Sequence, residues 1–152
     1  MAMTAALMMS GSVAQAQDVN IGRSNITLTS DLMTPETLWA MGRIGAAQAS
    51  PDGKKIVYQV GYYSVKENKG HQVLRVMDAD GKNDRLLTTS AKSEGDAAWL
   101  DNNTLAFLTG GQLWTMNADG TNRKQLTHSD IDIEGFRFSP DRKRVVLIKS
   151  IP

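Results

Sequence analysis

The chain has 152 residues, of which 41% are hydrophobic, and its 17 basic and 16 acidic residues give a formal net charge of +1. This composition predicts a folded chain rather than a disordered one. The charge is nearly balanced and forms no basic stripe, which argues against a nucleic-acid-binding surface. Cysteine is absent, which excludes disulfides, thiolate catalysis and zinc–thiolate sites.

Residues 1–16 have the pattern of a secretory signal peptide. The short apolar run from Ala5 to Met9 is followed by Ala14-Gln15-Ala16, which fits the small residues that precede a cleavage site. The basic residues that usually open such a segment are missing. We expect a bacterial protein exported to the periplasm or secreted, with no segment apolar and long enough to span a membrane once residues 1–16 are removed.

Residues 17–44 are expected to form a polar lead-in with one short helix. Thr34 suits the cap position, Pro35 the first helical position and Glu36 the positive end of the helix dipole. Apolar side chains between residues 38 and 41 give this helix one face with which to pack against the rest of the domain.

From residue 45 onward two turn motifs recur, which indicates an internal repeat. Ser50-Pro51-Asp52-Gly53 aligns with a turn around Asp101 and with Ser139-Pro140-Asp141, at spacings of about 40 to 50 residues. Ala-Asp-Gly ends at Gly81 and again at Gly120, and each is followed by Leu-Thr. Both motifs favour tight turns, and β-branched and aromatic runs lie between them.

Four short antiparallel strands in each repeat of about 40 residues predict the blades of an all-β propeller. We assign blade 1 to residues 45–89, with a polar hairpin extension at 62–70, and blade 2 to residues 90–130. Residues 131–152 form the first half of a third, truncated blade. A β-sandwich is the alternative, but two motifs repeating in register argue against it. Propellers close with four to eight blades, so we expect a fragment, and residues 17–152 alone are expected to aggregate or stay partly unfolded.

No catalytic residue is predicted. The nearest approach to a G-x-S-x-G nucleophile motif is the segment from Gly22 to Ile26, which lacks the second glycine. His71 and His128 have no triad partners and are expected to be solvated loop residues. The acidic loop at residues 78–84 lacks the glycine and glutamate positions of a calcium loop, so we expect neither a metal nor a cofactor.

Glu94 and Glu134 are the candidate substrate-binding residues. Each precedes a glycine and lies a few residues before the expected first strand of a blade. The first strand of a propeller blade lines the central channel, so these carboxylates would face the channel mouth and hold a peptide amine. The alternative is that both are solvated loop carboxylates beside a glycine chosen for its turn.

The Ser-Pro-Asp-Gly and Ala-Asp-Gly turns resemble the PD40, or WD40-like, repeats shared by TolB and by peptidases of the prolyl oligopeptidase family. The approach from Leu32 to Trp39, together with Tyr62-Tyr63-Ser64-Val65 and Ile133-Glu134-Gly135-Phe136, is similar to exported peptidases of the dipeptidyl-peptidase 5 and acylaminoacyl-peptidase branch. The resemblance covers about residues 30–152.

This resemblance implies a propeller that gates and positions short peptides for a C-terminal α/β-hydrolase domain, which carries a serine, an aspartate and a histidine. None of these three residues maps onto this chain. The alternative that the repeats leave open is a non-enzymatic, TolB-like periplasmic interaction module.

Overall fold

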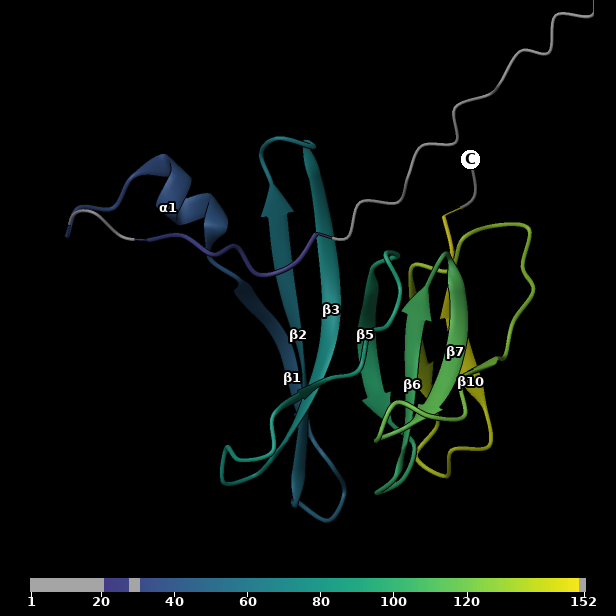
Figure 1. Ribbon diagram of the computed structural model, residues 1–152. Coiled ribbons are helices and arrows are strands. Elements are labelled where there is room, and N and C mark those ends of the chain that lie inside the picture. The colour runs from purple at the N-terminus through teal and green to yellow at the C-terminus, as the bar shows by residue number, and fades with distance from the viewer. Residues whose placement is uncertain (1–20, 28–30, 151–152) are drawn as a thin grey trace, which may run out of the picture.

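The computed structural model describes residues 21–27 and 31–150, so the predicted signal peptide lies outside the described residues (Figure 1). The described chain contains one helix and three antiparallel sheets, whose strand orders are β1-β2-β3-β4, β5-β6-β7-β8 and β9-β10. The predicted all-β architecture of four-stranded blades with a short preceding helix is therefore confirmed.

The elements follow one another in simple chain order, and each sheet is a meander. The helix is α1 (Pro35–Ala40), and the first sheet, which we call blade 1, comprises β1 (Arg43–Ala49), β2 (Lys55–Ser64), β3 (Lys69–Asp78) and β4 (Arg85–Leu86). Blade 2 comprises β5 (Glu94–Trp99), β6 (Thr104–Thr109), β7 (Gln112–Asn117) and β8 (Lys124–Gln125). The third sheet pairs β9 (Gly135–Phe138) with β10 (Val145–Ile148).

The helix α1 begins as its sequence predicts. The Thr37 N–H donates to the Thr34 hydroxyl at 3.2 Å, which satisfies one of the free amides of the first turn. At the other end the Trp39 ring lies 4.9 Å from the ring of Tyr63, and the Arg43 guanidinium lies 4.8 Å from the Trp39 ring centre. The helix thus rests on the β2–β3 hairpin.

The turns between the first two strands of each sheet are held by aspartates. The Asp52 carboxylate accepts hydrogen bonds from the Ser50 hydroxyl at 2.6 Å and from the Lys54 N–H at 3.2 Å. Ser139 donates to Asp141 at 2.6 Å in the third sheet, which reproduces the first turn. We call Asp52, Asp101 and Asp141 the turn aspartates. The hydrogen bonds that each accepts lower its carboxyl pKa below the usual value.

The hairpin extension expected at residues 62–70 is present. The strand β2 continues to Ser64 and β3 starts at Lys69, and the pairing between Tyr62 and His71 continues the ladder beyond the length of the other blade's hairpin. Asn68 completes the turn with a φ of +47°, a conformation that asparagine tolerates better than most residues.

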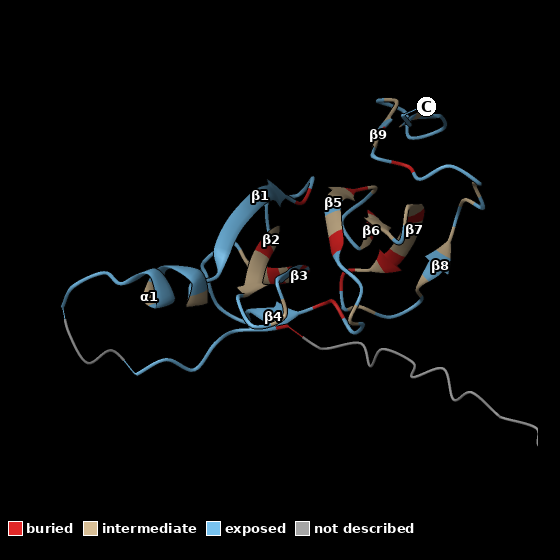
Figure 2. Ribbon diagram, turned by 90° about the horizontal axis from the view of Figure 1, so that it is seen from above, coloured by how far each residue is buried: buried red, intermediate tan, exposed pale blue. Residues whose placement is uncertain are grey.

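Apolar side chains fill the space between the blades. The core between blades 1 and 2 consists of Val57, Leu74, Val76, Leu87, Trp99, Leu105, Phe107, Met116 and Ala118. A smaller cluster of Ala106, Leu113, Ile133 and Phe136 lies between blade 2 and the third sheet. Seen from above, the first strands β1, β5 and β9 lie along one side, and the two-residue strands β4 and β8 lie on the opposite side (Figure 2).

Candidate functional site

Glu94 is the first residue of β5, and it is buried rather than solvated, with a relative exposure of 1%. Its Oε1 accepts a hydrogen bond from the Arg123 guanidinium, while its Oε2 has no hydrogen-bond partner among the described residues. The alternative interpretation of Glu94 as a solvated loop carboxylate is therefore wrong. A carboxylate removed from water needs a compensating cation, and Arg123 supplies it.

Arg123 connects the two blades. Its Nη1 donates to the Leu87 carbonyl of blade 1 at 3.2 Å, and its guanidinium lies 4.9 Å from the ring centre of Phe107 in blade 2. The Glu94 carboxylate thus already has a cationic partner inside the protein. Its predicted role in holding a peptide amine stays a prediction.

Glu134 lies in a different environment. It precedes β9 directly, is exposed, and its Oε2 accepts a hydrogen bond from the Ser150 hydroxyl at 2.8 Å. No ion pair forms between Glu134 and another described residue. Glu94 and Glu134 occupy equivalent places in successive sheets, but only the carboxylate of Glu134 faces solvent.

Asp96 is an acidic residue that none of the sequence motifs marks. It lies within β5 at a β-bulge between Gly95 and Ala98, and its backbone has a φ of +50°. The other four described non-glycine residues with positive φ lie in turns or beside them, so Asp96 is exceptional in being inside a strand. Strained backbone of this kind is concentrated at functional sites in proteins.

The neighbours of Asp96 hold the bulge in place. The Gln59 side chain of blade 1 accepts a hydrogen bond from the Asp96 N–H at 3.3 Å. A Cβ on Gly95 would lie 2.9 Å from the Gln59 amide oxygen and 3.1 Å from that of Gln72, so the glycine permits this close approach. The exposed Asp96 carboxylate itself makes no hydrogen bond or ion pair to a described residue.

A polar cavity of about 200 Å³ opens beside this bulge. It is lined by Gln72, Ser93, Gly95, Asp96, Leu108, Thr109, Gly110 and Gly111. The cavity lies where blade 1 meets blade 2, because Gln72 belongs to β3 and the remaining residues belong to blade 2 or the segment before it. A bulge also interrupts β1 between Ile44 and Ala47, and both bulges become visible only once the strand register is known, so the sequence carried no signal for Asp96.

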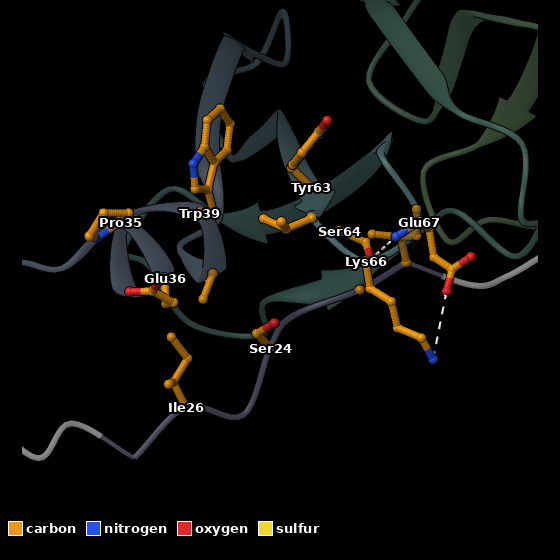
Figure 3. Close-up of a pocket in the computed structure, with 13 residues that line it drawn as sticks. Ser24, Ile26, Pro35, Glu36, Trp39, Tyr63, Ser64, Lys66 and Glu67 are labelled. Carbon is orange, nitrogen blue, oxygen red and sulfur yellow. Dashed lines mark hydrogen bonds and ion pairs between the residues drawn. The ribbon is translucent and has the colours of Figure 1, made fainter.

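A larger cavity of about 680 Å³ lies on the side of blade 1 that carries α1 (Figure 3). Its walls come from residues 21–26, from α1 with Pro35 and Trp39, and from the hairpin end with Tyr63 and Val65. Figure 3 shows Trp39 and Tyr63 on one side and Ser24 and Ile26 on the other. The cavity therefore depends on where the segment before the helix lies.

The expectation that His71 is a solvated loop residue is wrong. It is 4% exposed on β3, and its two ring nitrogens contact backbone carbonyls of Ile21 and Lys92. Ser24, from the rejected nucleophile motif, lies in a segment without helix or strand.

Among the described residues, no three histidine or acidic side chains lie close enough together to hold a metal ion. That part of the chain also has no helix of a length and apolarity that would cross a membrane.

Comparison with known proteins finds relatives that match this chain in sequence. No protein-family profile matches it. Dipeptidyl-peptidase 5 of Porphyromonas endodontalis is 35% identical to it over 130 residues, and that of Porphyromonas gingivalis is 41% identical over 130 residues. Each match covers 82% of this chain and 19% of the relative, so the chain spans about a fifth of the length of these relatives.

Solved structures show the same fold. Acylaminoacyl peptidase of Pyrococcus horikoshii superposes with a TM-score of 0.59 at 12% identity, covering 73% of this chain and 18% of that one. An oligogalacturonate lyase in complex with manganese superposes with a TM-score of 0.56 at 19% identity, covering 72% of this chain and 35% of the other. The chain is therefore similar in sequence to about a fifth of dipeptidyl-peptidase 5, and it shares its fold with part of each of these solved structures.

Proposed function

We propose that this chain is the propeller part of an exported serine exopeptidase that acts on short peptides. The 130-residue match to two dipeptidyl-peptidase 5 sequences carries this proposal. Since that match covers 19% of each relative, the catalytic serine, histidine and aspartate are expected in a hydrolase domain encoded beyond this chain. There the histidine would accept the serine proton during attack on the peptide carbonyl.

The propeller would contribute to this reaction by selecting and orienting the peptide. Its first strands β1, β5 and β9 lie along one side of the described chain, and Asp96 and Glu134 present exposed carboxylates on β5 and just before β9. An exposed carboxylate can hold a peptide ammonium group through a charge-assisted hydrogen bond. Glu94 is two residues from Asp96 but is paired with Arg123, so we assign it a supporting role in holding the blades together.

The coding sequence downstream of Pro152 provides the first test. We expect several more blades, then G-x-S-x-G, and then an aspartate and a histidine in that order. The protein made from the whole reading frame should react with a fluorophosphonate label, and the label should be lost when that serine is replaced by alanine. A stop codon after a complete propeller, or no labelling, would instead favour a TolB-like interaction module.

The role of the carboxylates is tested by kinetics on the same protein. Asp96→Asn should raise KM about tenfold for a dipeptide substrate with a free amine, which corresponds to about 1.4 kcal/mol of binding. A substrate whose amine is acylated should be unaffected. Glu134→Gln is tested in the same way. Glu94→Gln is the control, because Glu94 is paired with Arg123: it should change the stability of the protein and leave the difference between free and acylated substrates as it is. Equal losses for free and acylated substrates would refute amine binding by these residues.

Export is tested by the start of the mature protein. We propose cleavage after Ala16, so the protein recovered from the periplasm or medium should begin at Gln17. Recovery of the protein from the cytoplasm with Met1 still attached would refute export.

A further inference from the structure

Two buried polar atoms on neighbouring strands of blade 2 have no hydrogen-bond partner among the described residues. They are Oε2 of Glu94 on β5 and Oγ1 of Thr109 on β6. The pairing of β5 with β6 places these two residues directly opposite each other. Residues that are directly opposite in an antiparallel ladder carry their side chains on the same face of the sheet. Buried polar atoms in proteins are almost always satisfied, so this pair of oxygens indicates a bound partner.

The face of the sheet that carries both oxygens is the one that blade 1 covers. Arg123, which donates to Oε1 of Glu94, also donates to the Leu87 carbonyl of blade 1. Thr109 lines the cavity of about 200 Å³ together with Gln72 of blade 1. The two unpartnered oxygens therefore lie at the seam between the blades, on the side of the sheet where this cavity opens.

The polar side-chain atoms nearest to the bulge are oxygens. The amide oxygens of Gln59 and Gln72 lie 2.9 and 3.1 Å from the position that a Cβ of Gly95 would take. The Ser93 hydroxyl, which accepts a hydrogen bond from the Gln72 N–H at 3.0 Å, is a further oxygen in the wall. The Asp96 carboxylate is exposed and forms no ion pair with a described residue. The cavity thus offers a set of oxygen ligands with one uncompensated negative charge.

We propose that this cavity binds an alkali cation, with Oε2 of Glu94, Oγ1 of Thr109 and the Asp96 carboxylate as ligands. Carboxylate, amide and hydroxyl oxygens are hard ligands, which suit hard cations rather than zinc or copper. The charge decides between a monovalent and a divalent ion. Arg123 already neutralises Glu94, so the one charge left is that of Asp96, and a monovalent ion balances it. Within the described residues, no group of three acidic or histidine side chains is present to hold a divalent ion.

Two further charged groups lie at the rim of the cavity. The Lys92 ammonium lies 3.8 Å from the position that a Cβ of Gly110 would take, and the Asp132 carboxylate overlaps the corresponding position at Gly111. Both glycines line the cavity, and neither charged side chain forms an ion pair with a described residue. Their charges are opposite, so they leave the balance unchanged. Because Lys92 repels a second cation, Lys92→Met should strengthen the binding of an alkali ion.

Sodium-23 NMR measures this binding on the protein made from the whole reading frame, because a bound sodium ion relaxes faster than a free one. Sodium chloride replaces choline chloride step by step, so that the ionic strength, and with it the screening of surface charges, stays constant. Line broadening that saturates with the sodium concentration reports a bound ion and gives its dissociation constant. Potassium chloride added in place of choline then shows which of the two alkali ions the site prefers.

Thr109→Val is the decisive variant, because it keeps the β-branched shape and removes a hydroxyl that has no partner among the described residues. We expect it to weaken the binding of sodium or potassium at least about fivefold, which corresponds to about 1 kcal/mol. Asp96→Asn removes the charge that the ion balances and should weaken binding at least as much. Thr115→Val is the matched control, since Thr115 lies on β7 and does not line the cavity, and it should bind the ion as the wild type does.

Three results would overturn the proposal. The first is the absence of saturable broadening in the wild-type protein, a measurement that needs no variant and so holds even if a variant fails to fold. The second is unchanged affinity in both Thr109→Val and Asp96→Asn, which would mean that water satisfies the two oxygens. The third is displacement of sodium by calcium chloride at concentrations at which potassium has no effect, which would assign the site to a divalent ion.

The binding measurement involves no substrate, so it does not depend on the peptidase assignment. A second consequence rests on the proposed function, because a peptide ammonium and an alkali ion are both compact cations and would compete for Asp96. The KM for a dipeptide with a free amine should therefore rise as the alkali ion replaces choline, while the KM for an acylated substrate should not. An unchanged KM together with intact ion binding would refute amine binding by Asp96 and leave the cation site in place.

Discussion

Replacing Arg123 with methionine tests how strongly the buried Glu94 carboxylate depends on its partner. Methionine keeps most of the side-chain volume but removes the guanidinium, its hydrogen bond to Leu87 and its contact with Phe107. Breaking a buried ion pair by removing one partner costs about 3 to 5 kcal/mol. The Arg123 side chain is 23% exposed, so water can partly replace it, and we expect a loss near the lower limit, about 3 kcal/mol.

The matched control is Arg75→Met, the same chemical change in a more exposed pair. Arg75 and Asp84 are 26% and 37% exposed, and the hydrogen bonds from Arg75 hold the pKa of Asp84 below its usual value. Pairs at the surface contribute about 1 kcal/mol or less. Asp84 keeps its bond from Tyr58 at 2.7 Å when Arg75 is replaced, which limits the loss further.

The assay is urea denaturation of the intact protein, with the free energy of unfolding taken from the midpoint and slope. The double variant Glu94→Gln with Arg123→Met should be more stable than Arg123→Met alone, because it removes the uncompensated charge. The reasoning is refuted if Arg123→Met costs no more than Arg75→Met, or if adding Glu94→Gln makes the Arg123 variant less stable.

Four further predictions concern the turns. Gly53→Ala should lower the free energy of unfolding in urea by about 1 to 2 kcal/mol, because Gly53 has a φ of +70°. No atom lies within 4 Å of the added Cβ, so the whole cost comes from the backbone conformation. Gly111→Ala should cost at least about 1 kcal/mol more, since its φ is +68° and its Cβ would lie 2.0 Å from Oδ1 and 2.9 Å from Cβ of Asp132, so that rotating the Asp132 carboxylate relieves only part of the overlap. Arg142→Gly should stabilise the protein by up to about 1 kcal/mol, because Arg142 has a φ of +60° where the first turn has glycine; no gain in the midpoint would contradict this. The turn aspartates have lowered pKa values in the folded state, so their contribution to the free energy of unfolding is present at neutral pH and should be lost as the pH falls below about 4. Ser139→Ala should reduce this loss of stability in an acid titration monitored by circular dichroism, because it removes the hydrogen bond from the Ser139 hydroxyl to Asp141.

The repeat made the blades predictable from sequence. Pro51, Asp52 and Gly53 fix a turn through local chemistry, and Asp80 with Gly81 fix another, so the strands between them follow from residues only a few positions apart. The helix was predictable for the same reason, because Thr34 caps an amide three residues away. These features depend on short-range hydrogen bonds and backbone preferences, which the sequence displays directly.

The candidate site was less predictable because its residues acquire their roles through contacts between blades. Glu94 is buried with Arg123, 29 positions later, as its partner, and the Arg123 guanidinium also contacts Phe107. His71 is buried by Ile21, which lies 50 residues before it. Asp96 stands out only after the register of β5 and β6 reveals the bulge. Neither charge pattern nor periodicity records such distant pairings.

The outermost strands β4 and β8 are only two residues long. A chain that joins a sheet from outside needs a continuous row of free backbone N–H and C=O groups to pair with, and two residues offer almost none. Beyond β4 the chain turns inward, where the N–H of Leu87 bonds to the carbonyl of Leu74 at 2.8 Å and the Thr88 hydroxyl accepts from the Leu74 N–H at 2.8 Å. Blade 2 ends in the same way, because the N–H of Leu126 bonds to the carbonyl of Leu113 and the Thr127 hydroxyl accepts from the Leu113 N–H. The outer edge of each blade therefore resists recruitment into intermolecular sheets.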